Sequence, residues 1–214
     1  MRLLLFIPLL FCSLILQAQS KVPLKETNSY LRVEINGVPD RIVSKAEKSP
    51  DYSIHYASWY GDKKNYVLVL NFKAPLTQKW TDVVFTFVPN RSGRIWLRIG
   101  GRWSKLYEER NWLVINSVSR NGKLMPNGDF KKYREKVQDE EYRPMNWILG
   151  NRAQYYLDAG ENKTPACIVN HDNPVTGSFE VRAGEANTFV IRVQTARKNL
   201  IPKPVSSRRN TRRK

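Results

Sequence analysis

Cysteine and histidine are scarce in this chain of 214 residues, with two of each. Cys12 lies in an apolar run at the N-terminus, so if that run is cleaved off as a signal, Cys167 has no partner for an intramolecular disulfide. An exported protein without disulfides must rely on its apolar core, which favours a bacterial over an animal source. His55 and His171 are far apart in the sequence, so they do not form a histidine pair at metal-ligand spacing.

Motifs of catalysis are also missing. The sequence contains no Gly-x-Ser-x-Gly turn and no phosphate-binding glycine loop. His171 and Asp172 precede Asn173-Pro174, a turn sequence in which adjacent side chains rarely face each other, so a role in the turn is favoured over a catalytic pair. The acidic runs at 108–109 and 139–141 are interpreted as solvated charge, because glycosidase carboxylates oppose each other across roughly 5 to 9 Å of cleft. We therefore expect no enzymatic activity and no cofactor.

Acidic residues are also few: the chain has 19 acidic residues and 36 lysines and arginines, which gives a formal net charge of +17. No acidic residue follows Ala196, and residues 197–214 are predicted to be a disordered tail. The tail holds eight of the basic residues: Arg197, Lys198, Lys203, Arg208, Arg209, Arg212, Arg213 and Lys214. Its last five basic residues are the predicted polyanion-binding part, because charge without fixed shape binds any polyanion.

Long apolar runs are absent except at the N-terminus. Residues 1–18 have the pattern of a secretory signal peptide, with Arg2, an apolar run over 3–16 and Ala18 as a small residue for cleavage. The run is shorter than the roughly 20 apolar residues that cross a bilayer. Phe11 stands where a bacterial lipoprotein signal has a small residue before its lipidated cysteine, so a lipid anchor on Cys12 is the minor alternative. We expect a secreted or periplasmic protein with a polar leader over 19–28 and no transmembrane segment.

The region 29–196 reads as strands. Alternating or continuous apolar residues separated by turn residues predict about ten short strands and hence an all-β sandwich. The predicted strands are 31–35, 52–59, 65–73, 80–88, 94–99, 112–118, 154–157, 166–170, 177–182 and 187–195. Arg32 and Glu34 are predicted on a solvated face, 65–73 and 80–88 are apolar on both faces, and Trp80 and Trp147 are predicted in the core.

Two turns lie close together between the predicted strands, Asn121-Gly122 and Pro126-Asn127-Gly128. The second turn continues into Asp129 and Phe130, and this Asn-Gly-Asp-Phe sequence resembles the first strand of the jelly-roll carbohydrate-binding modules of the galactose-binding-like superfamily. The segment 127–197 resembles the opening half of such a module and 66–118 the closing half, in reversed order. The resemblance implies a single jelly-roll-like sandwich permuted near Asn121, since the first and last strands of that fold are neighbours. Two abutting small domains are the alternative.

The resemblance also bears on calcium. Many such modules hold a structural calcium between a glutamate after Asn-Gly-Asp-Phe and an aspartate of the last strand, because calcium prefers carboxylate and carbonyl oxygens. This chain has Lys131 at the first position and Asn116-Ser117 at the second. We therefore expect no calcium site here, despite Asp129.

The predicted strand 94–99 carries the candidate binding face. Ile95, Leu97 and Ile99 alternate with Arg94, Trp96 and Arg98, and Trp103 follows after a glycine turn. A flat aromatic ring beside guanidinium groups suits stacking on a sugar while pairing with its sulfate or carboxylate. The competing interpretation packs Trp96 beneath a loop and makes the arginines solubilising charge. Trp59 and Tyr60 form a second candidate rim.

Two functions are compatible with these features. The first is an exported, non-catalytic module that binds carbohydrate, with acidic or sulfated glycans favoured. The alternative is an envelope-associated structural protein that its basic tail holds to anionic surfaces. Nucleic acid is not the expected partner, because a signal peptide directs the chain out of the cytoplasm.

Overall fold

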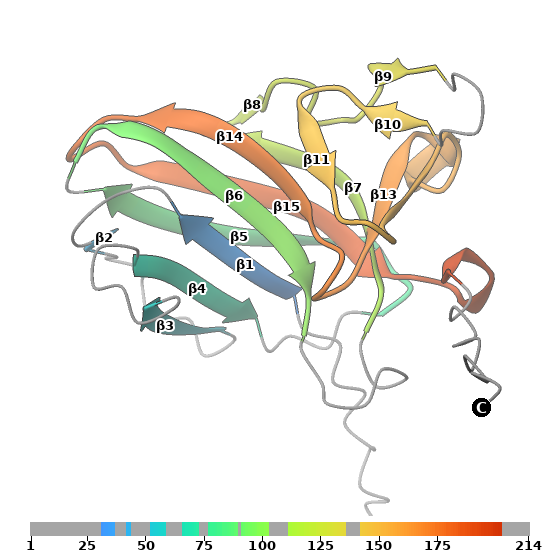
Figure 1. Cartoon of the computed structure of the whole chain (residues 1–214), viewed down its shortest axis with the longest axis horizontal. Helices are drawn as coiled ribbons and strands as arrows, with labels where there is room; N and C mark the ends of the chain where they lie inside the picture. The colour runs from blue at the N-terminus through green and yellow to red at the C-terminus, as the bar shows by residue number, and fades with distance from the viewer. Residues whose placement is uncertain are drawn as a thin grey trace, which may run out of the picture.

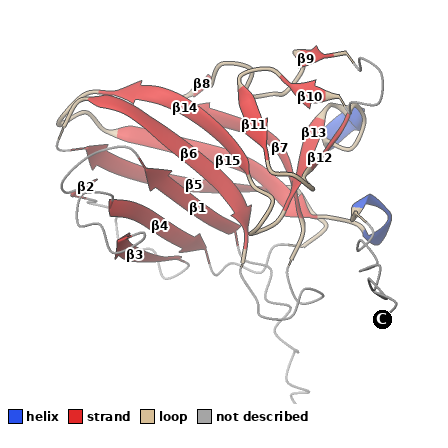
Figure 2. Cartoon of the chain, viewed as in Figure 1, coloured by secondary structure: helices blue, strands red, loops and turns tan. Residues whose placement is uncertain are grey.

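The computed structural model describes residues 31–36, 42–43, 52–58, 66–72, 77–89, 91–102, 111–135 and 142–202. These ranges contain fifteen β-strands and two single-turn 3-10 helices, and the strands form two main antiparallel sheets packed face to face (Figures 1 and 2). The predicted all-β sandwich is confirmed. The predicted signal peptide and leader, Trp59, Tyr60, Trp103 and residues 203–214 lie outside the described ranges.

The first sheet has six strands in the order β11-β14-β6-β1-β4-β3. Their bounds are β11 (Trp147–Leu149), β14 (Val175–Val181), β6 (Gly93–Gly101), β1 (Leu31–Asn36), β4 (Tyr66–Phe72) and β3 (Tyr52–Ser58). Figure 1 shows this sheet in front, with β14 and β6 running side by side along it.

The second sheet has seven strands, with β12-β13-β7-β15-β5-β2 in order and β8 paired to β7. Their bounds are β12 (Gln154–Tyr156), β13 (Ala166–Val169), β7 (Leu113–Arg120), β15 (Asn187–Thr195), β5 (Thr81–Pro89), β2 (Ile42–Val43) and β8 (Lys123–Leu124). A separate pair, β9 (Tyr133–Arg134) and β10 (Arg143–Pro144), lies beside β11 (Figure 2). All ten strands predicted from the sequence are present, with ends within two residues of the predicted ones.

Strands from both sides of Asn121 are neighbours in both sheets. β14 pairs with β6 in the first sheet, and β15 lies between β5 and β7 in the second. The chain crosses from one sheet to the other between β5 and β6 and again between β14 and β15. The segments before and after Asn121 therefore build the same pair of sheets.

The core between the sheets follows from the alternation of the strands. Ile95, Leu97 and Ile99 of β6 are fully buried, as their spacing predicts. Opposite them, Phe85 and Phe189 stack with ring centroids 5.3 Å apart, within a cluster of phenylalanines from β5, β14 and β15. Such tightly packed aromatic pairs contribute roughly 0.5 to 1.5 kcal/mol each beyond the area that they bury.

A second apolar cluster lies on the other face of the seven-stranded sheet. Its buried members are Trp112, Val114, Ala166, Ile168 and Ala196, and Trp80 packs against it half-buried. The chain continues past Ala196 through the 3-10 turn η3 (Lys198–Leu200), which brings Leu200 and Ile201 onto the cluster. Packed structure therefore extends five residues beyond the predicted end of the sandwich.

The join near Asn121 is a tight hairpin between β7 and β8. Asn121 has φ 51° and Gly122 φ 76°, the left-handed pair of values that the Asn-Gly sequence predicts. The side chain of Asn121 also accepts a hydrogen bond from Thr188 N (2.8 Å) and donates to Ala186 O (3.2 Å), which ties the turn to β15.

The Asn-Gly-Asp-Phe segment follows directly and is held against β7. Val118 N donates to Gly128 O (2.8 Å), and Phe130 is fully buried. Asn127, with φ 53°, accepts a hydrogen bond from Lys132 N and donates to the carbonyls of Lys132 and Met145. The asparagine thus joins its own turn to two other backbone segments, at Lys132 and Met145, which accounts for its place in the turn.

Trp147 of β11 is buried, as predicted, and its indole Nε1 lies 3.1 and 3.0 Å from the carbonyl oxygens of Pro126 and Asn127.

Among the residues described above, no helix is long and apolar enough to cross a membrane.

Candidate functional site

The outer face of β6 carries the side chains that the sequence singles out. Because Ile95, Leu97 and Ile99 point into the core, Arg94, Trp96 and Arg98 point away from it. Trp96 is 39% exposed, which decides against a tryptophan packed entirely beneath a loop. An indole held on a regular strand and open to solvent is a preformed platform for a flat ligand.

The neighbouring strands place short or charged side chains around Trp96. The strand register puts Ser178 of β14 on one side of Trp96 and Asn36 of β1 on the other. Glu180 lies opposite Arg94, and their charged groups are 3.5 Å apart on well-exposed side chains. Such an exposed pair contributes little to stability, so both groups can turn toward a ligand at small cost.

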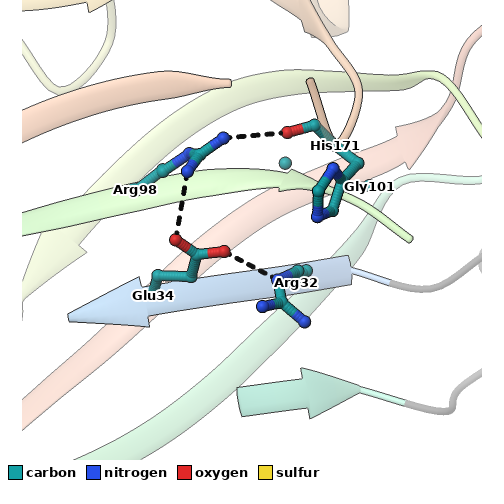
Figure 3. Close-up of a pocket in the computed structure, with 6 residues that line it drawn as sticks. Arg32, Glu34, Arg98, Gly101 and His171 are labelled. Atoms are coloured by element: carbon teal, nitrogen blue, oxygen red, sulfur yellow. Dashed lines mark hydrogen bonds and ion pairs between the residues drawn. The ribbon is translucent and has the colours of Figure 1, made fainter. Parts of the chain in front are cut away.

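Arg98 has a different environment from Arg94. Its Nη1 donates to Glu34 Oε2 (3.2 Å) and its Nη2 donates to His171 O (3.1 Å), so its side chain is only 20% exposed (Figure 3). The guanidinium therefore braces the sheet against the 171–172 turn, and fewer of its five donors remain for a ligand.

Glu34 corrects a prediction. The alternation of residues 31–35 puts its side chain on a solvated face, but Glu34 is 4% exposed. The physical reason is a second guanidinium: Arg32 Nε donates to Glu34 Oε1 (2.7 Å), so each carboxylate oxygen accepts from one arginine. A buried carboxylate is tolerated when it is paired and hydrogen-bonded in this way.

A shallow hollow with no room for a water molecule lies beside this network. Its walls are formed by Arg32, Glu34, Arg98, Gly100, Gly101 and His171. A Cβ added to Gly100 would lie 2.7 Å from Asn170 O, so only glycine allows the 170–173 turn to approach β6 this closely.

The turn itself is organised by Asn170, whose Oδ1 accepts from the backbone N of Asp172 (3.1 Å) and of Asn173 (2.9 Å). His171 Nδ1 lies 2.9 Å from Asp172 Oδ1, so the prediction that these adjacent side chains do not face each other is wrong. The side-chain cap of Asn170 bends the backbone tightly enough to bring both onto one side, and this same bend gives the residues their role in the turn.

The two positions expected to replace calcium ligands have partners within the chain. Lys131 Nζ lies 3.2 Å from Asp129 Oδ2. Asn116 Oδ1 accepts from Glu161 N (2.8 Å) and from Thr164 Oγ1 (2.9 Å), and so anchors the loop that includes Glu161. The hydrogen-bonded guanidinium of Arg192 in turn lowers the pKa of the Glu161 carboxyl below its ordinary value. In the described ranges, no group of three or more His, Cys, Asp or Glu side chains is arranged to hold a metal ion.

Calcium is accordingly expected to leave the melting temperature unchanged. Ligand that binds only the folded state raises stability by RT ln(1 + [L]/Kd), so a site with millimolar affinity gives a measurable rise at about 10 mM calcium. Differential scanning fluorimetry with calcium and then with EDTA measures this. A rise that EDTA reverses would contradict the prediction, and magnesium at the same ionic strength is the control.

Two ionisable groups lie in the core, away from the outer face. Burial raises the pKa of the Cys167 thiol well above its ordinary value, so the thiol stays protonated at neutral pH. Burial also raises the pKa of Tyr155, whose hydroxyl donates to Phe130 O (2.7 Å). Neither group has the exposure that a nucleophile requires.

Comparison of the chain with protein-family models, with curated proteins and with solved structures finds no match. The site is therefore defined by its own geometry. The structure brings Arg94, Trp96 and Arg98 onto one face, and it adds Arg32, Glu34 and His171, which sequence reasoning missed. Arg32 and Glu34 each had a signal, a charge between two apolar residues of a strand, and His171 had one in its neighbour Asp172, but nothing in the sequence pairs Glu34 with Arg98.

Proposed function

We propose that the protein is an exported, non-catalytic carbohydrate-binding module of the jelly-roll type and that its ligand is an acidic glycan. The observation that carries this proposal is Trp96, 39% exposed in the middle of a regular strand between two arginines. Sugar rings present an apolar face that stacks on an indole, and guanidinium groups pair with carboxylates or sulfates.

The order of the strands supports the jelly-roll assignment. The chain passes from the second sheet to the first between β5 and β6, and from the first sheet to the second between β14 and β15. β5 pairs with β15, and β6 pairs with β14. Double-sheet jelly rolls wrap one antiparallel pair of strands around two sheets in this manner. The resemblance to the galactose-binding-like superfamily is supported by the Asn-Gly-Asp-Phe segment, which is hydrogen-bonded to β7 through Val118.

The side chains around Trp96 suit a hydroxylated ligand. Ser178 on β14 is too short to cover the indole, and its hydroxyl can donate to and accept from sugar hydroxyls. Arg94 and Glu180 together offer donors and acceptors at the same end of the face. On the described part of this face three arginines stand against two glutamates, and the net charge of +17 on the whole chain attracts anions at longer range.

The Trp96→Ala variant tests this function. We expect the affinity for a preferred glycan to fall about fivefold or more, since a stacked aromatic contact in a partly desolvated site contributes on the order of 1 kcal/mol. Glycan-array screening in moderate salt identifies the ligand, and titration calorimetry measures the change. Tyr142→Ala is the matched control, because Tyr142 is 38% exposed but lies before β10, away from β6.

Both variants are melted before titration. A Trp96→Ala protein that melts like the wild type and binds every glycan like the wild type would contradict the proposal. Uniform binding of all polyanions by the wild type would instead favour the second candidate, an envelope-associated protein held to anionic surfaces by its basic tail.

The tail is tested separately by removing residues 203–214. This deletion takes away six basic residues and keeps Leu200 and Ile201, which cover the second apolar cluster. We expect about tenfold weaker binding to heparin at low salt and a shallower dependence of affinity on salt concentration, because fewer counterions are released. The measurement is affinity across a salt series. An unchanged salt dependence would contradict a role for the tail, and the preference among glycans should be the same with and without it.

A further inference from the structure

We propose that the outer face of the ribbon formed by β9 and β10 is a second binding site, which holds a phosphate monoester between the guanidinium groups of Arg134 and Arg143. The ribbon lies beside β11, whereas Trp96 lies on β6 (Figure 1). The site goes beyond the proposed function and does not depend on it, because it shares no side chain with the face around Trp96.

The strand register sets the two arginines against each other. Arg134 of β9 lies directly opposite Arg143 of β10, and Tyr133 lies opposite Pro144. Side chains at directly opposed positions of an antiparallel pair have Cβ atoms about 5 Å apart, so like charges there destabilise the pair. The ribbon therefore holds two positive charges close together at a cost in stability, which an anion bound between them would remove.

The two faces of the ribbon have different environments. Pro144 is buried, and Tyr133 is half-buried with its ring centroid 5.9 Å from that of Tyr155 in the core. Arg134 and Arg143 alternate with these two residues and are exposed. The tyrosine and the proline therefore anchor the inner face, and both guanidinium groups are on the solvent side.

The backbone of the ribbon is fixed by the Asn-Gly-Asp-Phe turn. Asn127 Nδ2 donates to the carbonyls of Lys132 and Met145 (2.7 Å each), and Asn127 Oδ1 accepts from Lys132 N (2.8 Å). Met145 N also donates to Lys132 O (2.8 Å), which continues the pairing of β9 and β10 by one residue. The spacing of the two arginines is therefore set before a ligand arrives, and this preorganisation lowers the cost of binding.

The charges on the ribbon leave the two arginines available. Within the described ranges, no acidic side chain forms an ion pair with Arg134 or Arg143. Lys131 is paired with Asp129, while Lys132 is exposed and lies two residues before Arg134, on the same face of the strand. Three positive charges stand against that of Glu135, which follows β9, so the described excess is 3 − 1 = +2. A phosphate monoester carries roughly −1.5 to −2 at neutral pH.

The chemistry of two opposed guanidinium groups favours phosphate over other anions. Each arginine presents a planar fork that pairs with two oxygens at once. One fork occupies both oxygens of a carboxylate, whereas the three terminal oxygens of a phosphate monoester leave room for a second fork. A sulfate monoester has the same shape but a single negative charge, so it neutralises only one of the two arginines.

The test titrates methyl phosphate and methyl sulfate into the full chain at pH 8 and constant ionic strength, with the arginine Nε–H signals followed by NMR. We expect methyl phosphate to bind about fivefold or more tightly than methyl sulfate, and Arg143→Gln to weaken methyl phosphate about tenfold, the effect of one lost charge-assisted contact. Arg182→Gln is the matched control, because it removes an exposed arginine beyond the end of β14 that does not pair with β11. Trp96→Ala should leave both affinities unchanged, so this site and the proposed function fail separately.

Arg134→Gln is the second variant and should weaken methyl phosphate by a similar factor. Neither glutamine variant should lower the melting temperature, because each relieves a repulsion between like charges. A lower melting temperature would show that the arginine has a partner within the chain and would overturn the site. Absence of methyl phosphate binding by the wild type, or equal binding by the wild type and both glutamine variants, would overturn it as well. Arg143→Lys keeps the charge without the fork, so wild-type affinity in this variant would overturn the two-fork geometry.

The source of the phosphate is distinguished by two further probes, hexose 6-phosphate and phosphatidylcholine vesicles that contain phosphatidic acid, a lipid whose headgroup is a phosphate monoester. Binding of hexose 6-phosphate that is lost in Arg143→Gln assigns the site to a phosphorylated sugar. Cosedimentation with the vesicles that is lost in the same variant assigns it to a lipid headgroup. Retention of both interactions in Arg143→Gln would place phosphate binding elsewhere on this basic chain and overturn the site.

Discussion

Expressed separately, residues 27–120 and residues 123–202 are expected to remain unfolded. The first fragment contains β6, β5 and β7 but neither β14 nor β15, their partners in the two sheets. The second fragment contains β14 and β15 without those neighbours, so its apolar faces have nothing to pack against. A hairpin, or a sheet whose apolar face is uncovered, is only marginally stable in water, since independent stability needs three or more strands with a covered apolar face.

Circular dichroism and thermal melting of each purified fragment measure this expectation. The intact chain over 27–202 is the control and should show one cooperative transition. A sharp thermal transition in either fragment alone would contradict the shared sheets. If the cooperative thermal transition returns when the two fragments are mixed, this would support the shared sheets, because only the covalent join at Asn121-Gly122 is then absent.

Replacement of Trp147 by alanine is expected to destabilise the protein by about 3 to 5 kcal/mol, the range for a large aromatic removed from a core. The ring lies edge-on to Phe130, with centroids 5.4 Å apart, and covers Gly177, where an added Cβ would lie 2.7 Å from the indole. Its Nε1 also donates to the carbonyls of Pro126 and Asn127. The substitution therefore removes packing and hydrogen bonds from the same turn.

Urea unfolding of the variant measures the loss, and the melting temperature should fall by roughly 10 °C or more for a chain of this size. Trp147→Phe separates the contributions, since it keeps most of the packing and loses only the indole N–H. Trp96→Ala is the control for a half-exposed tryptophan and should change stability little. A loss below about 1 kcal/mol for Trp147→Ala would show that the Asn-Gly-Asp-Phe turn is held by other contacts.

The fold could be predicted from the sequence wherever a strand is long enough to show a period. β6 alternates from Arg94 to Ile99, and the buried positions of Ile95, Leu97 and Ile99 follow from that alternation alone. β8 and β11 span two and three residues, too few to show a period, and were not predicted from the sequence. The assignment of 80–88 as apolar on both faces is wrong, because Val84 is 52% exposed on the outer face of β5.

The site could be predicted only in part. Local alternation places Arg94, Trp96 and Arg98 together, since all three lie on one strand. The pairing of Arg98 with Glu34 joins residues 64 positions apart and depends on β1 and β6 being neighbours, which no local pattern encodes. The expectation for His171 and Asp172 failed for another reason: a general rule about adjacent turn residues was applied to a turn in which the Asn170 side chain caps the backbone and the two side chains lie in contact.

The position of β15 between β5 and β7 delays completion of the second sheet during synthesis. Phe189 pairs with Phe85 about a hundred residues earlier in the chain, and at about 5 to 20 residues per second a ribosome takes roughly 5 to 20 s to add that length. During this interval β5 and β7 have no strand to occupy the gap between them. Contacts so distant in sequence also form slowly once the chain is complete, on the scale of milliseconds to seconds. The nascent protein therefore spends its synthesis with open sheet edges, a state in which a chaperone or a translocation machinery can bind it and self-association competes with folding.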